Sequence, residues 1–308
     1  MNRMTRSAIP ALALAMASAT CTALHHRDRS TGYVMANGIN TYYERYGDGP
    51  PLILVHGAAM VAEAWRPQIE AFARDFTVFV PERRGVGRTG DIDGEWSYDG
   101  MAADTAAFLD AVKVRKAFVV GMSDGGNIGL ILAYTRPDLV RRLVVSGANI
   151  NPEGLGELKD EFAGMTPDQL LASAPPQVSP WLELQRRVSP DAGQNLIHSF
   201  AKMKRMWLNF EITPSQLARI TVPTLVMGGD HDMIPVPHTV EIWASIPGAT
   251  LCIAPDASHF WLEEKPELAN EIILSFLLDS RIGIGPQAAD ESAQPDDGAD
   301  RRDRPALE

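Results

Sequence analysis

Cysteine is scarce in this chain, which has two among its 308 residues. Two cysteines cannot build a disulfide framework, and Cys252 lies in an apolar run at 250–254 that is typical of a buried, unreactive strand residue. Neither thiol has an evident partner histidine, and no histidine, cysteine and acidic residues have the spacing of a metal site. We therefore expect neither thiol chemistry nor a metal or organic cofactor.

Positive charge is also in short supply. Lysine and arginine number 28 against 39 acidic residues, which gives a formal net charge of −11. This balance argues against nucleic acid or an anionic membrane as the main partner and leaves a small-molecule substrate as the expected one. Part of the negative charge falls at 285–308, a stretch of Pro, Gly, Ala and Asp that we predict to be a disordered acidic tail.

Long apolar runs are absent except near the N-terminus, where 8–19 is rich in alanine and follows two arginines. With Ala17-Ser18-Ala19 as a small-x-small cleavage pattern, residues 1–20 are predicted to be a signal peptide, and the protein to be periplasmic or secreted. The run is short for a membrane span. A misassigned start, an uncleaved anchor and a lipid anchor on Cys21 remain alternatives, and only the last two would bring the protein to a membrane.

The rest of the chain alternates short apolar runs with amphipathic stretches, which predicts an α/β fold with a mostly parallel sheet. The core is expected at 30–148 and 220–282, and its first two strands flank Asn37-Gly38, a hairpin signal. The expected strands are 33–36, 42–46, 52–55, 76–80, 117–120, 143–145, 224–227 and 250–253. The expected helices are 63–74, 101–112, 127–135, 239–245 and 266–278.

Residues 149–219 interrupt this alternation, because they contain no convincing strand, many prolines, two tryptophans (Trp181 and Trp207) and methionines at 165, 203 and 206. We interpret them as a helical lid inserted between two strands of the sheet. Their aromatic side chains are expected both to form a small core of their own and to face a substrate.

Chemistry is indicated first at Gly121-Met122-Ser123-Asp124-Gly125-Gly126, which follows an expected strand and precedes an expected helix. This is the context of a G-x-S-x-G nucleophile elbow, in which glycines permit a sharp turn that exposes the serine hydroxyl. Ser123 is therefore the candidate nucleophile.

A serine hydroxyl needs a base and an acid that orients it. Of the seven histidines, His259 is the candidate base, because it follows the last expected strand and precedes the last helix, where parallel sheets place functional loops. The acid is expected after the strand at 224–227, where Asp230 and Asp232 are both available. We favour Asp232 as the triad acid and assign Asp230 to the turn.

Two backbone amides are expected to form an oxyanion hole. One is the N–H of Ala58, in the small-residue loop that follows the strand at 52–55, and the other is the N–H of Asp124. His56 in the first loop is expected to be structural. The side chain of Asp124 is a candidate for selecting substrates with a positive charge near the ester, and the alternative is that it only caps the following helix.

These residues together resemble the α/β-hydrolase superfamily of serine hydrolases over residues 32–280. The likeness includes residues 82–89, similar to the family's arginine–glycine turn except at Val86, where histidine or tyrosine is common. Residues 121–126 and 146–149 look most like the biphenyl hydrolase-like subgroup, which hydrolyses esters of amino acids. The resemblance implies the α/β-hydrolase fold: a mostly parallel eight-stranded sheet with helices on both faces and a lid insertion.

The sequence thus predicts a serine hydrolase that cleaves carboxylic esters of small molecules through an acyl-enzyme. Cleavage of C–C bonds, amides or lactones, or perhydrolysis, could use the same triad. A non-catalytic ligand-binding protein on this scaffold is the alternative from another class. Dehalogenation is disfavoured, because it needs a carboxylate where Ser123 stands.

Overall fold

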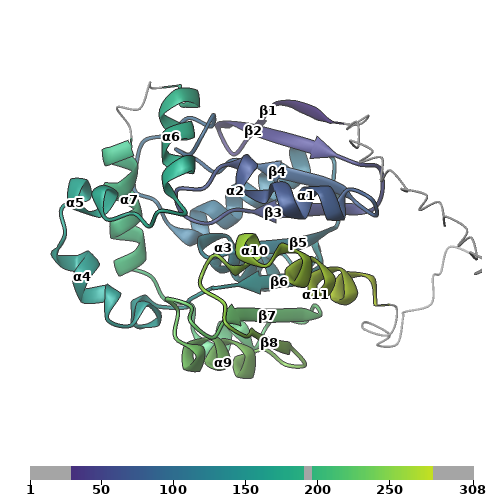
Figure 1. The fold of residues 1–308 in the computed structure, drawn as a ribbon. Coiled ribbons are helices and arrows are strands. Elements are labelled where there is room, and N and C mark those ends of the chain that lie inside the picture. The colour runs from purple at the N-terminus through teal and green to yellow at the C-terminus, as the bar shows by residue number, and fades with distance from the viewer. Residues whose placement is uncertain (1–28, 191–195, 280–308) are drawn as a thin grey trace, which may run out of the picture.

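The computed structural model describes residues 29–190 and 196–279 (Figure 1). The predicted signal peptide at 1–20, with the alternative lipid anchor on Cys21, and the predicted acidic tail at 285–308 lie outside these residues and stay predictions. Within the described ranges, no helix is long and apolar enough to cross a membrane.

A single eight-stranded sheet forms the centre of the molecule, with the strand order β1-β2-β4-β3-β5-β6-β7-β8. β1 and β2 form an antiparallel hairpin, β2 is also antiparallel to β4, and every other neighbouring pair is parallel. The predicted mostly parallel sheet is confirmed. Its strands are β1 (Ser30–Ala36), β2 (Ile39–Tyr46), β3 (Pro51–Val55), β4 (Thr77–Pro81), β5 (Ala117–Met122), β6 (Val140–Ser146), β7 (Thr224–Gly229) and β8 (Thr250–Ala254).

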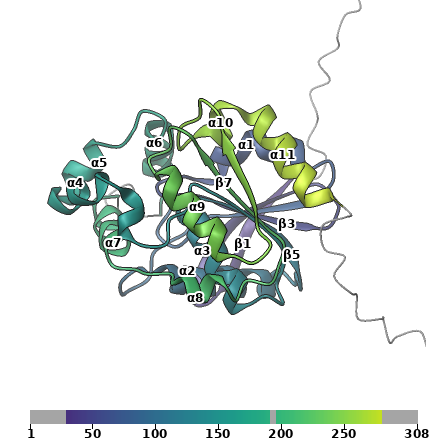
Figure 2. The same ribbon diagram turned by 90° about the horizontal axis from the view of Figure 1, so that it is seen from below.

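Helices cover both faces of the sheet, as Figures 1 and 2 show. α1 (Arg66–Phe72) and α11 (Pro266–Leu278) pack together on one face, and α2 (Tyr98–Ala111), α3 (Asp124–Thr135) and α9 (Val236–Ser245) lie on the other. All residues of β4, β5 and β7 are buried, which is why these strands are continuous apolar runs rather than alternating ones.

Between β6 and β7 the chain leaves the sheet and forms a lid at the carboxyl ends of the parallel strands, on the left in Figure 1. No strand occurs in the described part of this segment. The two ends of the excursion meet, because the amide of Ile212 donates to the carbonyl of Ile150 at 2.7 Å. The lid helices are η2 (Pro152–Leu155), α4 (Leu158–Gly164), α5 (Pro167–Ala172), α6 (Ser179–Val188) and α7 (Leu196–Leu208), whereas α8 (Pro214–Leu217) follows the return point and packs against α9 and α3 of the core.

Buried polar contacts fasten the lid to the core. Lys202 of α7 forms an ion pair with Asp91 at 2.5 Å, and both side chains are almost fully buried. On the next turn of α7, the indole of Trp207 reaches the start of α3, and from α6 the amide of Gln185 donates to the carbonyl of Ala59 at 2.5 Å. The lid therefore rests on the loops that follow β3, β4 and β5.

The short helix α10 (Trp261–Glu264) was not predicted. Residues far away in the sequence hold this helix in place. The indole N–H of Trp261 donates to the hydroxyl of Ser146 at 2.9 Å, and the carbonyl of Leu262 accepts from the side-chain amide of Gln68 at 2.7 Å. These contacts fix the loop that carries His259.

Glu263 in this helix makes stability depend on pH. Burial, with help from the charge of Glu264, raises the pKa of Glu263 to about 7. A raised folded-state pKa means stability that is complete below about 4.5 and is lost as the pH rises through about 7. Glu263→Gln should therefore raise the melting temperature at pH 8 by about 2–4 °C and leave it almost unchanged at pH 5. The exposed Glu267→Gln is the control, and an equal shift at both pH values would contradict the assignment.

Candidate active site

Ser123 occupies a sharp turn between β5 and α3. Its φ of 55° and ψ of −123° are strained for a residue with a side chain, and its amide donates to the carbonyl of Ser146 at 2.8 Å. The turn has no room for a side chain at Gly121 or Gly125, because a Cβ on Gly121 would strike the carbonyl of Gly125 and a Cβ on Gly125 would strike the carbonyl of Val55. The glycines of the motif thus let the strand, the turn and the helix approach closely enough to hold the hydroxyl at the sheet edge.

His259 and Asp232 meet after β8 and β7. His259 Nδ1 lies 2.6 Å from Asp232 Oδ1, and the two side chains are 7% and 1% exposed. The same Oδ1 accepts the amide of Ile234 at 2.9 Å, which fixes the carboxylate. A buried carboxylate on Nδ1 selects the tautomer that leaves Nε2 free to accept a proton.

Asp230, the other acidic candidate, has a different position. Its side chain is 39% exposed and accepts the amide of Ala257 at 2.9 Å. Hydrogen bonds from the backbone of Ala257 and Asp256 lower the pKa of Asp230. The structure thus brings Asp232 to the histidine and gives Asp230 the task of joining two loops.

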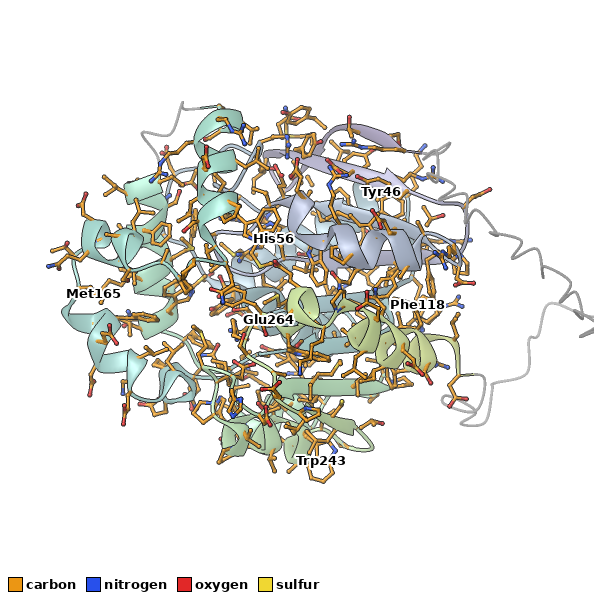
Figure 3. All side chains as sticks on the ribbon, viewed as in Figure 1. Tyr46, His56, Phe118, Met165, Trp243 and Glu264 are labelled. Carbon is orange, nitrogen blue, oxygen red and sulfur yellow. The ribbon has the colours of Figure 1, made fainter. Side chains whose placement is uncertain are left out.

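A cavity of about 210 Å³ lies between these loops and the lid, and both Ser123 and His259 line it. Its walls are mainly apolar, and Asp124 and Glu161 contribute the acidic side chains. Figure 3 shows His56 between the sheet and the lid helices, and Met165 on the lid. The apolar lining residues from the lid are Leu155, Leu158, Phe162, Leu170, Ala174, Pro175, Val178, Phe200 and Trp207.

The expected oxyanion amides, those of Ala58 and Asp124, belong to residues that line this cavity. Within the described chain, neither amide donates a hydrogen bond to another protein group, so both are available to a ligand. The loop after β3 is held in an unusual shape, with Ala59 at a φ of 58° and its carbonyl bound by Gln185. These features fit a preformed site for developing negative charge.

His56 is buried beneath this loop. Burial, with the nearby charge of Arg83, lowers the pKa of His56 to about 3, so its ring is neutral. Its Nδ1 lies 2.8 Å from the carbonyl of Gly57, and its Nε2 accepts the amide of Arg83 at 3.0 Å. The ring thus joins the loops after β3 and β4, which fits the structural role that we expected.

The carboxylate of Asp124 is 4% exposed and already has three donors. Oδ1 accepts the hydroxyl of Tyr98 at 2.7 Å and the indole N–H of Trp207 at 3.0 Å, and Oδ2 accepts Arg83 Nη2 at 3.2 Å. Burial and the charge of Asp124 raise the pKa of Tyr98 well above its usual value, so the phenol keeps the proton it donates.

These partners bear on both expectations for Asp124. A cationic substrate group would have to compete with Arg83 for the carboxylate. The three donors all lie outside α3, while Asp124 itself lies in the first turn of α3, where an acid suits the helix dipole. The partners could not be read from the sequence, since Tyr98 and Trp207 are 26 and 83 residues away. Arg83, Trp207 and Gln185 are therefore functional candidates that the sequence analysis missed.

Gly147, after β6, is a further residue whose role emerges only in the structure. Its φ is 61°, and a Cβ there would lie 2.7 Å from His259 Cε1 and 3.3 Å from Asp232 Oδ2. The absence of a side chain lets the histidine and the carboxylate pack against the backbone. In the described residues, no group of three or more histidine, cysteine or acidic side chains could hold a metal ion.

The known proteins to which this chain is similar include several hydrolases. The profile of the Alpha/beta hydrolase family matches residues 52–272. A putative carbamate hydrolase RutD of Azorhizobium caulinodans is 29% identical over 257 residues, which span 79% of this chain and 97% of the relative. A hydrolase from Pseudomonas aeruginosa PA01 superimposes with a TM-score of 0.64 at 27% identity, over 80% of this chain and 98% of that one. Est816, described as an N-acyl homoserine lactone degrading enzyme, gives 0.64 at 26% identity, over 79% and 99%.

The matched span runs from β3 into α11 and contains every residue that lines the cavity. The similar proteins are hydrolases named for different substrates, so the family fixes the type of reaction more firmly than the compound. The family match and the eight-stranded fold therefore agree that this chain is a hydrolase of the alpha/beta hydrolase family.

Proposed function

We propose that this protein is a serine hydrolase that cleaves carboxylic esters of small, largely apolar molecules through an acyl-enzyme. One observation carries the proposal. Ser123 in a strained turn faces the same cavity as His259, and the histidine is bonded to the buried carboxylate of Asp232.

Each residue then has a defined step. Ser123 Oγ attacks the ester carbonyl while His259 Nε2 takes its proton, and Asp232 holds the imidazole and stabilises its positive charge. The amides of Ala58 and Asp124 receive the oxyanion. His259 returns the proton to the leaving alcohol, and a water molecule that His259 deprotonates then releases the acid from Ser123.

The cavity favours substrates without charge near the acyl carbonyl. The lid side chains on its wall are mainly aliphatic or aromatic, and the Asp124 carboxylate nearest the serine is paired with Arg83. Apolar groups gain free energy from burial in such a site. A lactone is an internal ester and needs the same steps, and the similarity to Est816 makes it the second candidate.

The test is a panel of p-nitrophenyl esters, an N-acyl lactone and a neutral carbamate, with active sites counted by fluorophosphonate titration. We expect the butyrate to octanoate esters to give the highest kcat/KM. Amino-acid esters should not exceed their deaminated analogues. A chain that labels at Ser123 yet hydrolyses only the carbamate, or none of the panel, would contradict ester hydrolysis.

Gly147→Ala should slow turnover by about tenfold to a hundredfold, because the new methyl group displaces His259. The matched control is Gly248→Ala, where φ is also positive, at 70°, but nothing lies within 4 Å of the added Cβ. A side chain at positive φ should lower the free energy of unfolding of both variants by about 1 kcal/mol, so both melting temperatures should fall. Only Gly147→Ala should lower kcat per titrated site. Equal kcat values in the two variants would show that the added methyl group does not displace His259.

A further inference from the structure

Arg83 places a buried positive charge directly behind the candidate oxyanion hole. It follows Glu82 in the turn after β4, and its side chain is 6% exposed. Its Nη2 donates to the carbonyl of Gly57 at 2.9 Å and to Asp124 Oδ2 at 3.2 Å. One guanidinium nitrogen therefore contacts both segments that supply the oxyanion amides.

The first contact acts on a single peptide group. The carbonyl of Gly57 and the amide of Ala58 are two ends of the same planar unit, so a cation on the oxygen draws electron density from the nitrogen. Nδ1 of the neutral His56 ring lies 2.8 Å from the same oxygen. With a charged donor on its carbonyl, the Ala58 N–H is a stronger donor toward the cavity and is held in direction.

The second contact removes an electrostatic conflict. Asp124 carries both a carboxylate side chain and one of the two amides that are to bind the oxyanion. An unpaired negative charge on that carboxylate would repel the oxyanion. The hydroxyl of Tyr98 and the indole of Trp207 are neutral donors and cannot cancel the charge. Arg83 is the cation that pairs with it, at 3.2 Å in a site of low dielectric where the pairing is strong.

Stability alone gives little reason for this arrangement. The Nε of Arg83 is buried without a hydrogen-bond partner in the described structure, and Nη1 faces only the sulfur of Met101 at 3.3 Å. Burying a guanidinium with incomplete hydrogen bonding is costly, and apolar replacements of buried ion pairs are often neutral or stabilising. A charge kept there in spite of this cost points to a role in the reaction.

We propose that Arg83 is a positioning residue that tunes the oxyanion hole: it polarises the peptide whose N–H is that of Ala58 and neutralises Asp124 beside the second donor. The proposal rests on the proposed function, since it assumes that Ser123 forms an intermediate with an oxyanion.

The test uses a reagent whose reaction does not depend on the natural substrate. Diethyl p-nitrophenyl phosphate transfers its phosphoryl group to an active serine, releases p-nitrophenolate and places negative charge on the phosphoryl oxygen. The second-order rate constant is measured per reactive site for wild type, Arg83→Met, Arg83→Lys and the double variant Arg83→Met/Asp124→Asn. The control is Arg84→Met, since the neighbouring Arg84 pairs with Asp104 at 2.6 Å, away from the oxyanion amides.

We expect Arg83→Met to react about tenfold to a hundredfold more slowly, which is less than the loss of a direct oxyanion donor. Arg83→Lys should recover part of the rate. The double variant should react faster than Arg83→Met, because no unpaired carboxylate remains, yet more slowly than wild type. Arg84→Met should stay within about twofold of wild type.

A merely structural role would lower the number of reactive sites and the melting temperature but leave the rate per site unchanged. Wild-type rates in Arg83→Met, or a double variant slower than the single one, would overturn the proposal. If Arg83→Met does not fold, the test rests on the double variant Arg83→Met/Asp124→Asn. A wild-type rate constant in the double variant would then overturn the proposal. Phosphorylation of a wild type that hydrolyses no carboxylic ester would refute the proposed function alone, whereas no reaction at all would overturn both.

Discussion

Ser123→Ala is expected to abolish turnover of the best p-nitrophenyl ester, with kcat reduced by roughly 10⁴-fold to 10⁶-fold. The hydroxyl supplies the bond to the acyl group, and it stands on a strained turn in the wall of the cavity that His259 also lines. The binding of substrate should change little, because the cavity walls remain. Steady-state kinetics give kcat, and a titration with a product acid gives the affinity.

The matched control is Ser173→Ala. Ser173 also lines the cavity, but its hydroxyl donates to the carbonyl of Leu170 within the lid and lies in no elbow. Its replacement should leave kcat within about threefold of wild type. Full fluorophosphonate labelling of Ser123→Ala, located by peptide mass spectrometry at another serine, would show that Ser123 is not the nucleophile.

Asp232→Asn is expected to lower kcat by about 10⁴-fold. An asparagine amide in the same place can present an N–H to Nδ1 and so select the wrong tautomer, and it removes the negative charge that stabilises the imidazolium. The 2.6 Å contact with His259 Nδ1 and the 1% exposure of Asp232 make this carboxylate the direct partner of the histidine.

Asp230→Asn is the control for this change. It lies two residues away on the same loop and is half exposed, and its bond to the amide of Ala257 can be kept by the asparagine oxygen. We expect a loss of no more than a few-fold. Pre-steady-state measurement of acylation for both variants separates them, and a larger loss in Asp230→Asn would mean that the wrong acid has been chosen.

The strands could be predicted because the apolar pattern of each strand reflects how its two faces are buried. The runs that became β5 and β7 are apolar throughout, since both of their faces are covered by helices, and they end at glycines where the functional loops begin. Strand–helix alternation, the elbow and the chain order of Ser123, Asp232 and His259 are local signals. They sufficed to indicate the sheet, the two residues Ser123 and His259 that line the cavity, and the acid that contacts the histidine.

The rest depends on contacts between distant residues. Nothing near Asp124 in the sequence shows that its carboxylate meets Arg83, 41 positions earlier, or Trp207, 83 positions later. The expectation of cation selection did not include these contacts, because it treated the carboxylate as free. Two adjacent arginines at 83 and 84 look equivalent in sequence, yet one is buried behind the oxyanion amides and the other pairs with Asp104 on α2.

The hydrogen bond between Ile150 and Ile212 gives the lid a property relevant to evolution and engineering. Since the segment leaves and returns at one point, we expect that a change in its length, or its exchange for that of a relative, leaves the register of β6 and β7 unaltered. The triad residues all lie outside the excursion, whereas many of the apolar walls lie within it. Chimaeras joined at this pair of isoleucines, with Gln185 and Trp207 kept because they contact Ala59 and Asp124, would therefore combine Ser123, Asp232 and His259 of one parent with most of the apolar walls of the other.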